Sequence, residues 1–149
     1  MLTMTDTILI NGPITLEMIS SRIDLLSQKK ELGGHSIFLG QVRADVKGIK
    51  IVKAIDYSAY EEMVMKEADV IKKAIISEFS DVGSVDILHS TGRVMTGEVS
   101  LLVLVSAGHR QQAMTACSKT VELIKEKLPV WKKEIFEDDT HEWAQNNYA

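Results

Sequence analysis

The sequence has a single cysteine, Cys117, among its 149 residues, which excludes an intramolecular disulfide. It also has no long hydrophobic run. The longest uninterrupted one, Leu101 to Val105, matches a buried strand and falls far short of the ~20 residues that a membrane helix needs. Met1 to Asp6 carry no basic charge and precede no long apolar run. We therefore expect neither a signal peptide nor a transit peptide, and we expect a cytoplasmic protein.

Positive charge is scarce as well. The formal net charge of −4 argues against generic nucleic-acid binding, which requires clustered lysines and arginines. Basic residues nevertheless concentrate in the C-terminal third, at Lys125, Lys127, Lys132 and Lys133. This local concentration favours a site for a small anionic ligand.

The sequence also lacks two familiar kinds of site. It has no glycine-rich phosphate loop and no evident acidic pair for magnesium, which argues against a phosphotransfer or nucleotide-binding enzyme. No local spacing typical of metal ligands is found among the histidines, which are His35, His89, His109 and His141. We therefore expect no metal site.

Hydrophobic periodicity predicts three main helices. The first follows Thr15, a possible cap, and ends before Gly33; the last is terminated by Pro129. Spacings of three and four mark their apolar stripes, which are Leu16, Ile19, Ile23 and Leu26, then Val64, Ala68, Ile71, Ile75 and Phe79, and finally Ala113, Cys117, Val121, Ile124 and Leu128. Cys117 is thus expected to be a buried small hydrophobe.

Two strand pairs are predicted between these helices. The first is a hairpin of residues 35–42 and 51–57, with a turn through Asp45 to Gly48. The second joins residues 85–90 and 98–106, with Gly92 and Gly97 as turn residues. The chain after Pro129 is expected to be irregular. This order predicts a single α+β domain over residues 1–149 with a mostly antiparallel sheet.

Two segments near the ends of the last helix carry residues that suit anion binding. His109 and Arg110 stand at its start, where unpaired amides and the helix dipole attract phosphate or carboxylate. They are equally consistent with an ordinary helix start. Lys125 lies in the last turn, where the helix C-terminus favours a cation, so it is also consistent with a simple cap. However, the rigid Pro129 and the large Trp131 fix the direction in which Lys132 points, which a merely solvated lysine would not need.

A third segment is the apolar strand that ends at Arg43. The planar guanidinium of an arginine recognises phosphate or carboxylate through paired hydrogen bonds. Arginine is just as common at the rim of a strand without any ligand. On this segment alone both interpretations stay open.

Taken together and in this order, the three segments resemble the large subunit of molybdopterin synthase. They read FLGQVR, SAGHR and KEKLPVWKKE, and the last, with its lysine four residues before the proline, is the most specific. The resemblance covers about residues 9–143, including Tyr57 to Met63. The sequence departs from the family pattern at Gln41, which is lysine in some members, at Ala44 and at Gly108.

The resemblance implies an α/β-hammerhead-type fold and a sulfurtransferase. Members convert cyclic pyranopterin monophosphate into molybdopterin by placing two sulfurs as a dithiolene. The donor is the C-terminal thiocarboxylate of a small ubiquitin-like subunit, whose tail enters a pocket of the large subunit. Two large subunits form a central homodimer, with one small subunit at each end of the heterotetramer. No cofactor is implied.

The resemblance also implies roles for individual residues. Desolvation and neighbouring cations lower the pKa of a lysine, which lets it exchange a proton or form a transient bond. Lys125 is expected to have this central catalytic role, and Lys132 to stabilise a tetrahedral anion. His109 is expected to shuttle a proton. The expected substrate-binding residues are Gln41, Val42, Arg43, His109, Arg110, Lys133 and Glu134.

One alternative remains at this point. A non-enzymatic α+β module that oligomerises through its sheet edges and binds an anionic metabolite has the same composition. The two hypotheses differ in the site that they require. A regulatory module needs only a shallow phosphate cradle, whereas the synthase needs a pocket deep enough for a peptide tail.

Overall fold

The computed structural model describes residues 7–144, which form eight strands and three helices. In chain order the elements are β1 (Leu9–Asn11), α1 (Leu16–Leu26), β2 (Gly34–Gln41), β3 (Val46–Lys47), β4 (Lys50–Ala59), α2 (Glu61–Glu78), β5 (Val82–Met95), β6 (Val99–Ala107), α3 (Arg110–Lys127), β7 (Val130–Phe136) and β8 (His141–Trp143). The expectation that Met1 to Asp6 form no targeting segment lies outside the described residues.

All three predicted helices are confirmed. The N-cap of α1 is Thr15, whose hydroxyl oxygen accepts a hydrogen bond from the Met18 amide at 3.2 Å. The predicted stripe of α2 is buried from Val64 to Ile75. At the end of α3, the Leu128 amide still donates to the Ile124 carbonyl at 2.9 Å, and Pro129 then prevents a further turn.

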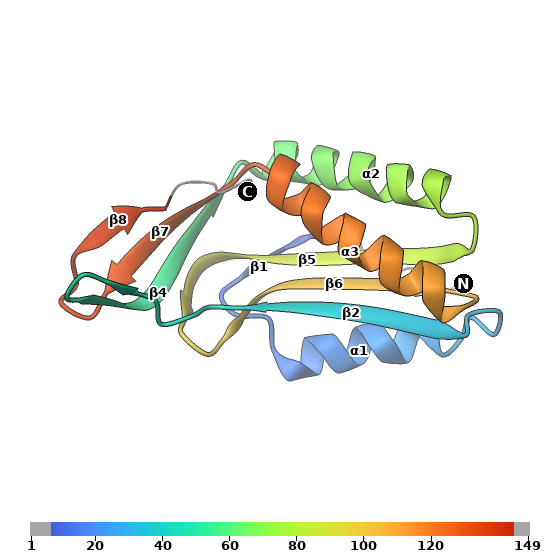
Figure 1. Cartoon of the computed structure of the whole chain (residues 1–149), viewed down its shortest axis with the longest axis horizontal. Coiled ribbons are helices and arrows are strands. Elements are labelled where there is room, and N and C mark those ends of the chain that lie inside the picture. The colour runs from blue at the N-terminus through green and yellow to red at the C-terminus, as the bar shows by residue number, and fades with distance from the viewer. Residues whose placement is uncertain (1–6, 145–149) are drawn as a thin grey trace.

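The strands form one mostly antiparallel sheet in the order β2-β6-β5-β4-β7-β8, as an α+β domain predicts. The short β1 pairs with β5 and is parallel to it, while β3 pairs with β4. Figure 1 shows α2 and α3 on one face of the sheet and α1 on the other, with β4, β7 and β8 extending beyond the helices. The sheet therefore has a helix-covered part and a projecting part.

The predicted hairpin of residues 35–42 and 51–57 is wrong. β2 pairs with β6, whereas β4 pairs with β5 and β7. The turn at Gly48 does form a hairpin, but its first strand is the two-residue β3. The strand β2 finds its partner about sixty residues later in the chain, which turn signals in the sequence cannot reveal.

The second hairpin is confirmed, except that Gly92 is not its turn. Strand β5 continues through Gly92, which has a φ of +75°, and the turn lies at Gly97. A Cβ atom on Gly92 would lie 2.6 Å from the Asn11 side-chain oxygen. Glycine is needed there for its conformation and for the close approach of β1.

The expectation of an irregular chain after Pro129 is also wrong, because β7 and β8 form an antiparallel pair there. The strand begins with the buried Val130 and the exposed Trp131, and Glu134 to Phe136 are all buried. The two half-buried lysines at its centre leave no alternating pattern of apolar residues in the sequence. This strand matters for function because it positions Lys132.

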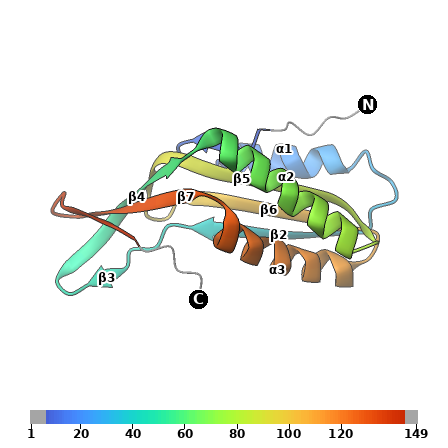
Figure 2. The ribbon, with the colours of Figure 1, turned by 90° about the horizontal axis from the view of Figure 1, so that it is seen from above.

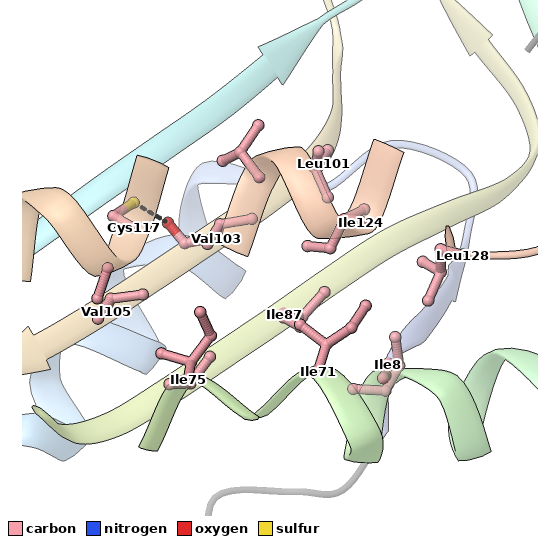
Figure 3. Close-up of a cluster of buried hydrophobic side chains, with 14 of the residues drawn as sticks. Ile8, Ile71, Ile75, Ile87, Leu101, Val103, Val105, Cys117, Ile124 and Leu128 are labelled. Carbon is pink, nitrogen blue, oxygen red and sulfur yellow. Dashed lines mark hydrogen bonds between the residues drawn. The ribbon is translucent and has the colours of Figure 1, made fainter. Parts of the chain in front are cut away.

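Two apolar clusters hold the layers together. On one face, side chains of α2 and α3 pack on the sheet, as Figure 3 shows for Ile71, Ile75 and Ile124. On the other face, Leu26 of α1 packs with residues of β5 and β6. Burial of each such side chain contributes about 1.5–3 kcal/mol. Cys117 is 4% exposed within the first cluster, which confirms its prediction as a buried small hydrophobe.

Candidate active site

A cleft of about 890 Å³ opens where the helix-covered part of the sheet meets the projecting part. Figure 2 shows the end of β2, the C-terminal end of α3 and the start of β7 converging in this region. We call it the cationic cleft. Its polar and charged lining residues are Gln41, Arg43, Asp45, Lys47, Tyr57, His89, Ser100, Lys125, Lys132, Glu134 and Glu142.

Lys125 reaches the cleft from the last turn of α3. A cation is favourable there because the helix dipole is negative at its C-terminus. Ile124 and Leu128 also line the cleft, so the end of the helix forms one wall. Lys127 lies in the same turn but is exposed and lies outside the lining.

Lys132 reaches the cleft from β7, because alternation along the strand directs Val130, Lys132 and Glu134 to one face. Burial lowers the pKa of Lys132, and the neighbouring charges of Lys125 and Arg43 lower it further, against the opposing effect of Glu134. The neutral amine is therefore more accessible at Lys132 than at an ordinary lysine.

Lys133 does not line the cleft. Its ammonium group lies 5.5 Å from the ring centroid of Trp143, in cation–π geometry. Within a single copy of the chain, Lys133 is thus turned away from the other predicted site residues by the same strand alternation that directs Lys132 inward.

Arg43 follows the end of β2 and stands at the edge of the cleft. Its side chain is 84% exposed, and its Nε lies 3.0 Å from an Asp45 carboxylate oxygen. Gln41 and Val42 also line the cleft, and Val42 is buried. The guanidinium is therefore open to solvent, and an incoming anion reaches it in competition with Asp45, to which its Nη2 also donates at 3.4 Å.

Sequence reasoning missed a further cation, Lys47 on β3. Its ammonium group donates a hydrogen bond to Glu134, whose side chain is 8% exposed. This bond raises the pKa of Lys47. The pair links the β3 turn to β7 across the cleft. A lysine beside a turn glycine is too common in sequences to indicate such a role.

Three further residues missed by sequence reasoning form the floor of the cleft: Tyr57, His89 and Ser100. They come from β4, β5 and β6, and all are buried. The tyrosine hydroxyl donates to the serine oxygen at 2.9 Å. The floor therefore carries neutral polar groups, while the cations Arg43, Lys47 and Lys125 are exposed and lie nearer to solvent.

His109 and Arg110 lie at the other end of α3, about 22 Å from Lys125 at 1.5 Å per residue. The backbone amide of His109 donates to an Asp81 carboxylate oxygen at 2.7 Å, and its Nδ1 lies 3.1 Å from the same oxygen. A separate hollow of about 480 Å³ adjoins both residues, together with Met114. One copy of the chain thus does not bring them to the cationic cleft.

Neither a metal-binding group nor a membrane-spanning helix is found between residues 7 and 144. No three His, Cys, Asp or Glu side chains in that range are placed to hold a metal ion. None of the helices there is both long and apolar enough to cross a bilayer.

The family model described as MoaE protein matches residues 10–127. The chain belongs to the MoaE family. A relative named molybdopterin synthase catalytic subunit, from Dictyostelium discoideum, is 38% identical over 116 residues, which is 76% of this chain and 73% of that protein. A longer relative of the same name from Drosophila grimshawi is 33% identical, and the chain spans 38% of its length.

Solved structures of this family share the fold. Molybdopterin synthase from Staphylococcus aureus superimposes with a TM-score of 0.82 at 28% identity, covering 95% of this chain and 98% of that chain. A complex of subunits 1 and 2 of molybdopterin-converting factor from Helicobacter pylori gives a TM-score of 0.79 at 18% identity, over 95% and 91% of the two chains. Membership of this enzyme family rules against the non-enzymatic alternative.

Proposed function

We propose that this chain is the catalytic subunit of a molybdopterin synthase and works in the cytoplasm. In this reaction, sulfur passes from the C-terminal thiocarboxylate of a small ubiquitin-like subunit to cyclic pyranopterin monophosphate and forms the dithiolene of molybdopterin. The observation that carries the proposal is the convergence of Arg43, Lys125 and Lys132 on one cleft.

The reaction needs such a cluster because both reactants are anions. The thiocarboxylate and the substrate phosphate repel one another, and fixed cations offset this repulsion while they hold the reacting atoms in place. The open guanidinium of Arg43 suits the capture of an incoming anion. No metal or organic cofactor is needed for this task, because the side chains of the chain provide the positive charge.

The two lysines have different tasks in this proposal. Lys125 exchanges a proton with the substrate while its ring opens. Once the thiocarboxylate sulfur is bonded to the substrate, water attacks the acyl carbon of the donor, and Lys132 stabilises the tetrahedral oxyanion that forms. The acyl C–S bond then breaks, so that the sulfur stays on the substrate and the small subunit leaves with a C-terminal carboxylate. The lowered pKa of Lys132 reflects a desolvated, electropositive environment, in which an oxyanion is stabilised more than it is in water. Cys117 is buried and takes no part, because sulfur arrives on the partner.

The partner in this proposal is a small subunit whose extended tail enters the cleft. A volume of about 890 Å³ is at the upper end of ordinary ligand pockets and accommodates a tail beside a pterin. The Helicobacter pylori complex supports the pairing of two subunits in a protein of the same fold.

We also propose that the chain works as a homodimer, the centre of a heterotetramer, in which His109 and Arg110 act in the cleft of the other copy. Within one copy they lie about 22 Å from Lys125 along α3. In a two-fold symmetric pair, the start of one α3 can meet the end of the other. Both copies then contribute to each site.

The first experiment is reconstitution with the thiocarboxylated small subunit and cyclic pyranopterin monophosphate, with the dithiolene product as the readout. We expect product from the unmodified chain and a loss of at least ~100-fold in Lys125→Met. The matched control is Lys127→Met, which removes the same charge from the same helical turn outside the cleft. Equal losses in both variants would contradict the proposed site.

A mixing experiment tests the contribution of the second copy. Arg110→Ala and Lys132→Ala are each expected to be inactive alone. After exchange of subunits, half of the dimers are mixed, and each mixed dimer has one intact site. The mixture should therefore recover about a quarter of the unmodified activity. No recovery, despite mixed dimers detected by native mass spectrometry, would show that both residues act in the same copy.

A further inference from the structure

The floor of the cationic cleft carries a group of neutral side chains that the proposed reaction does not yet use. Tyr57, His89 and Ser100 line the cleft and are exposed by only 7%, 7% and 6%. They lie on three neighbouring strands at the centre of the sheet. A ligand that fills the cleft meets them after it has passed the exposed residues Arg43 and Lys125.

The hydrogen-bonding state of His89 follows from its neighbours. Its Nδ1 lies 2.8 Å from the Ser90 carbonyl oxygen, which can only accept, so Nδ1 carries the hydrogen. Burial lowers the pKa of His89 to about 4, and the charges of Lys132 and Lys125 contribute to this shift. The ring is therefore neutral at pH 7, and its Nε2 presents a lone pair.

The surroundings fix the ring in place. The Tyr57 and His89 rings meet edge to face, with centroids 5.2 Å apart and an interplanar angle of 78°. The Tyr57 hydroxyl is itself fixed by its hydrogen bond to Ser100. Ser100 has no partner in β2, which pairs Gly40 with Leu101 and Gln41 with Val99. Ser100 is thus the extra residue of a β-bulge in β6. A bulge redirects the side chain of its extra residue, and here Ser100 lines the cleft.

The Nε2 atom of His89 has no hydrogen-bond partner within residues 7–144. This atom is also not fully buried. Within the same residues, the side-chain nitrogen and oxygen atoms that are both fully buried and without a hydrogen-bond partner are Asp86 Oδ2 and Ser90 Oγ, and Nε2 of His89 is not among them. The polar atoms of a buried side chain normally have a partner, so this reachable acceptor is open to a donor that enters the cleft. An oriented acceptor at the bottom of a binding cleft points to a donor on the ligand.

We propose that Nε2 of His89 accepts a hydrogen bond from an N–H group of the ligand and selects a heterocycle that presents such a donor at the floor of the cleft. The identity of that ligand rests on the proposed function: the reduced pterin ring of the substrate carries N–H groups, and its phosphate remains among the cations. His89 is then a substrate-binding residue that determines which edge of the ring is inserted.

Binding of cyclic pyranopterin monophosphate, titrated calorimetrically into the chain and two variants, tests this inference. His89→Gln keeps a neutral acceptor near the position of Nε2, whereas His89→Leu removes it. We expect the leucine variant to bind about tenfold more weakly and the glutamine variant to stay within about threefold of the unmodified chain. Unchanged binding by the leucine variant, or equal losses in both variants, overturns the proposal.

Two controls separate this outcome from others. Both variants lose the Nδ1 hydrogen bond to the Ser90 carbonyl and the ring contact with Tyr57, so thermal unfolding should shift by a similar amount in both. Binding of the small subunit should be unchanged in both, since it does not use Nε2. If the leucine variant does not fold, ¹⁵N NMR of the unmodified chain decides: the Nε2 resonance of His89 should shift when the pterin saturates the cleft, and an unmoved resonance overturns the proposal. If the unmodified chain binds no pterin at all, the proposed function fails together with this inference.

Discussion

Replacement of Lys132 by methionine should stabilise the fold while it abolishes the reaction. Methionine keeps most of the length of the side chain but not its charge. The pKa of Lys132 is lowered by burial, then by Lys125 and Arg43, so the folded chain holds this proton less tightly than the unfolded chain. At pH 7 the charged form therefore costs folding free energy, and the variant avoids that cost.

The pH dependence gives the magnitude. Between the lowered folded pKa and the unfolded value of 10.5, the unfolded chain binds more protons, so the unmodified protein gains stability as the pH rises. The gain is at most about 1.4 kcal/mol per pH unit. The advantage of Lys132→Met is thus largest near neutral pH and vanishes as the pH approaches 10.5. Each kcal/mol corresponds to roughly 2–4 °C in Tm for a chain of this size.

Urea unfolding of both proteins at several values from pH 7 to pH 10, together with the reconstitution assay at pH 7, measures these effects. The exposed Lys127→Met variant is the control and should change stability by less than about 0.5 kcal/mol. A Lys132→Met protein that is less stable than its parent, with a difference independent of pH, would show that this lysine is not desolvated among other cations.

Two further predictions follow from close contacts. Gly33→Ala would place a Cβ atom 2.4 Å from the Gly108 carbonyl oxygen, so thermal unfolding should show a loss of roughly 1–3 kcal/mol; an unchanged Tm would contradict this packing. Lys47→Met leaves the buried Glu134 carboxylate without its hydrogen-bond donor, so the free energy of unfolding measured in urea should fall by roughly 1–3 kcal/mol. Glu134→Gln leaves only a half-exposed lysine without its partner, so the free energy of unfolding should fall by less than about 1 kcal/mol. Equal costs would show that the carboxylate is not desolvated.

The helices could be predicted because their signals are local. The stripe from Val64 to Ile75 repeats every three or four residues, and Pro129 marks an end that no neighbouring element can alter. The pairing of β2 with β6 could not be predicted, since it joins segments about sixty residues apart and depends on which faces the helices cover. The strand β7 was missed because Lys132 and Lys133 made a half-buried strand look like a solvated segment.

The residues of the candidate site likewise divide into those with a local sequence signal and those whose position depends on the folded chain. The order of its motifs pointed to Arg43, Lys125 and Lys132, and the structure places these residues on one cleft. It places His109 and Arg110 at the far end of α3, a separation that no motif expresses. Lys47 and the residues of the cleft floor had no sequence signal, because depth below a surface is a property of the folded chain alone.

The most direct test of the proposed site is to locate the tail of the small subunit by cross-linking. A small subunit with an acyl electrophile at its C-terminus should acylate a lysine of the cleft, and peptide mass spectrometry identifies which one. We expect adducts on Lys125 or Lys132, both of which line the cleft. Adducts mainly on Lys127 or Lys133, or spread over surface lysines, would show that the tail does not enter the cationic cleft.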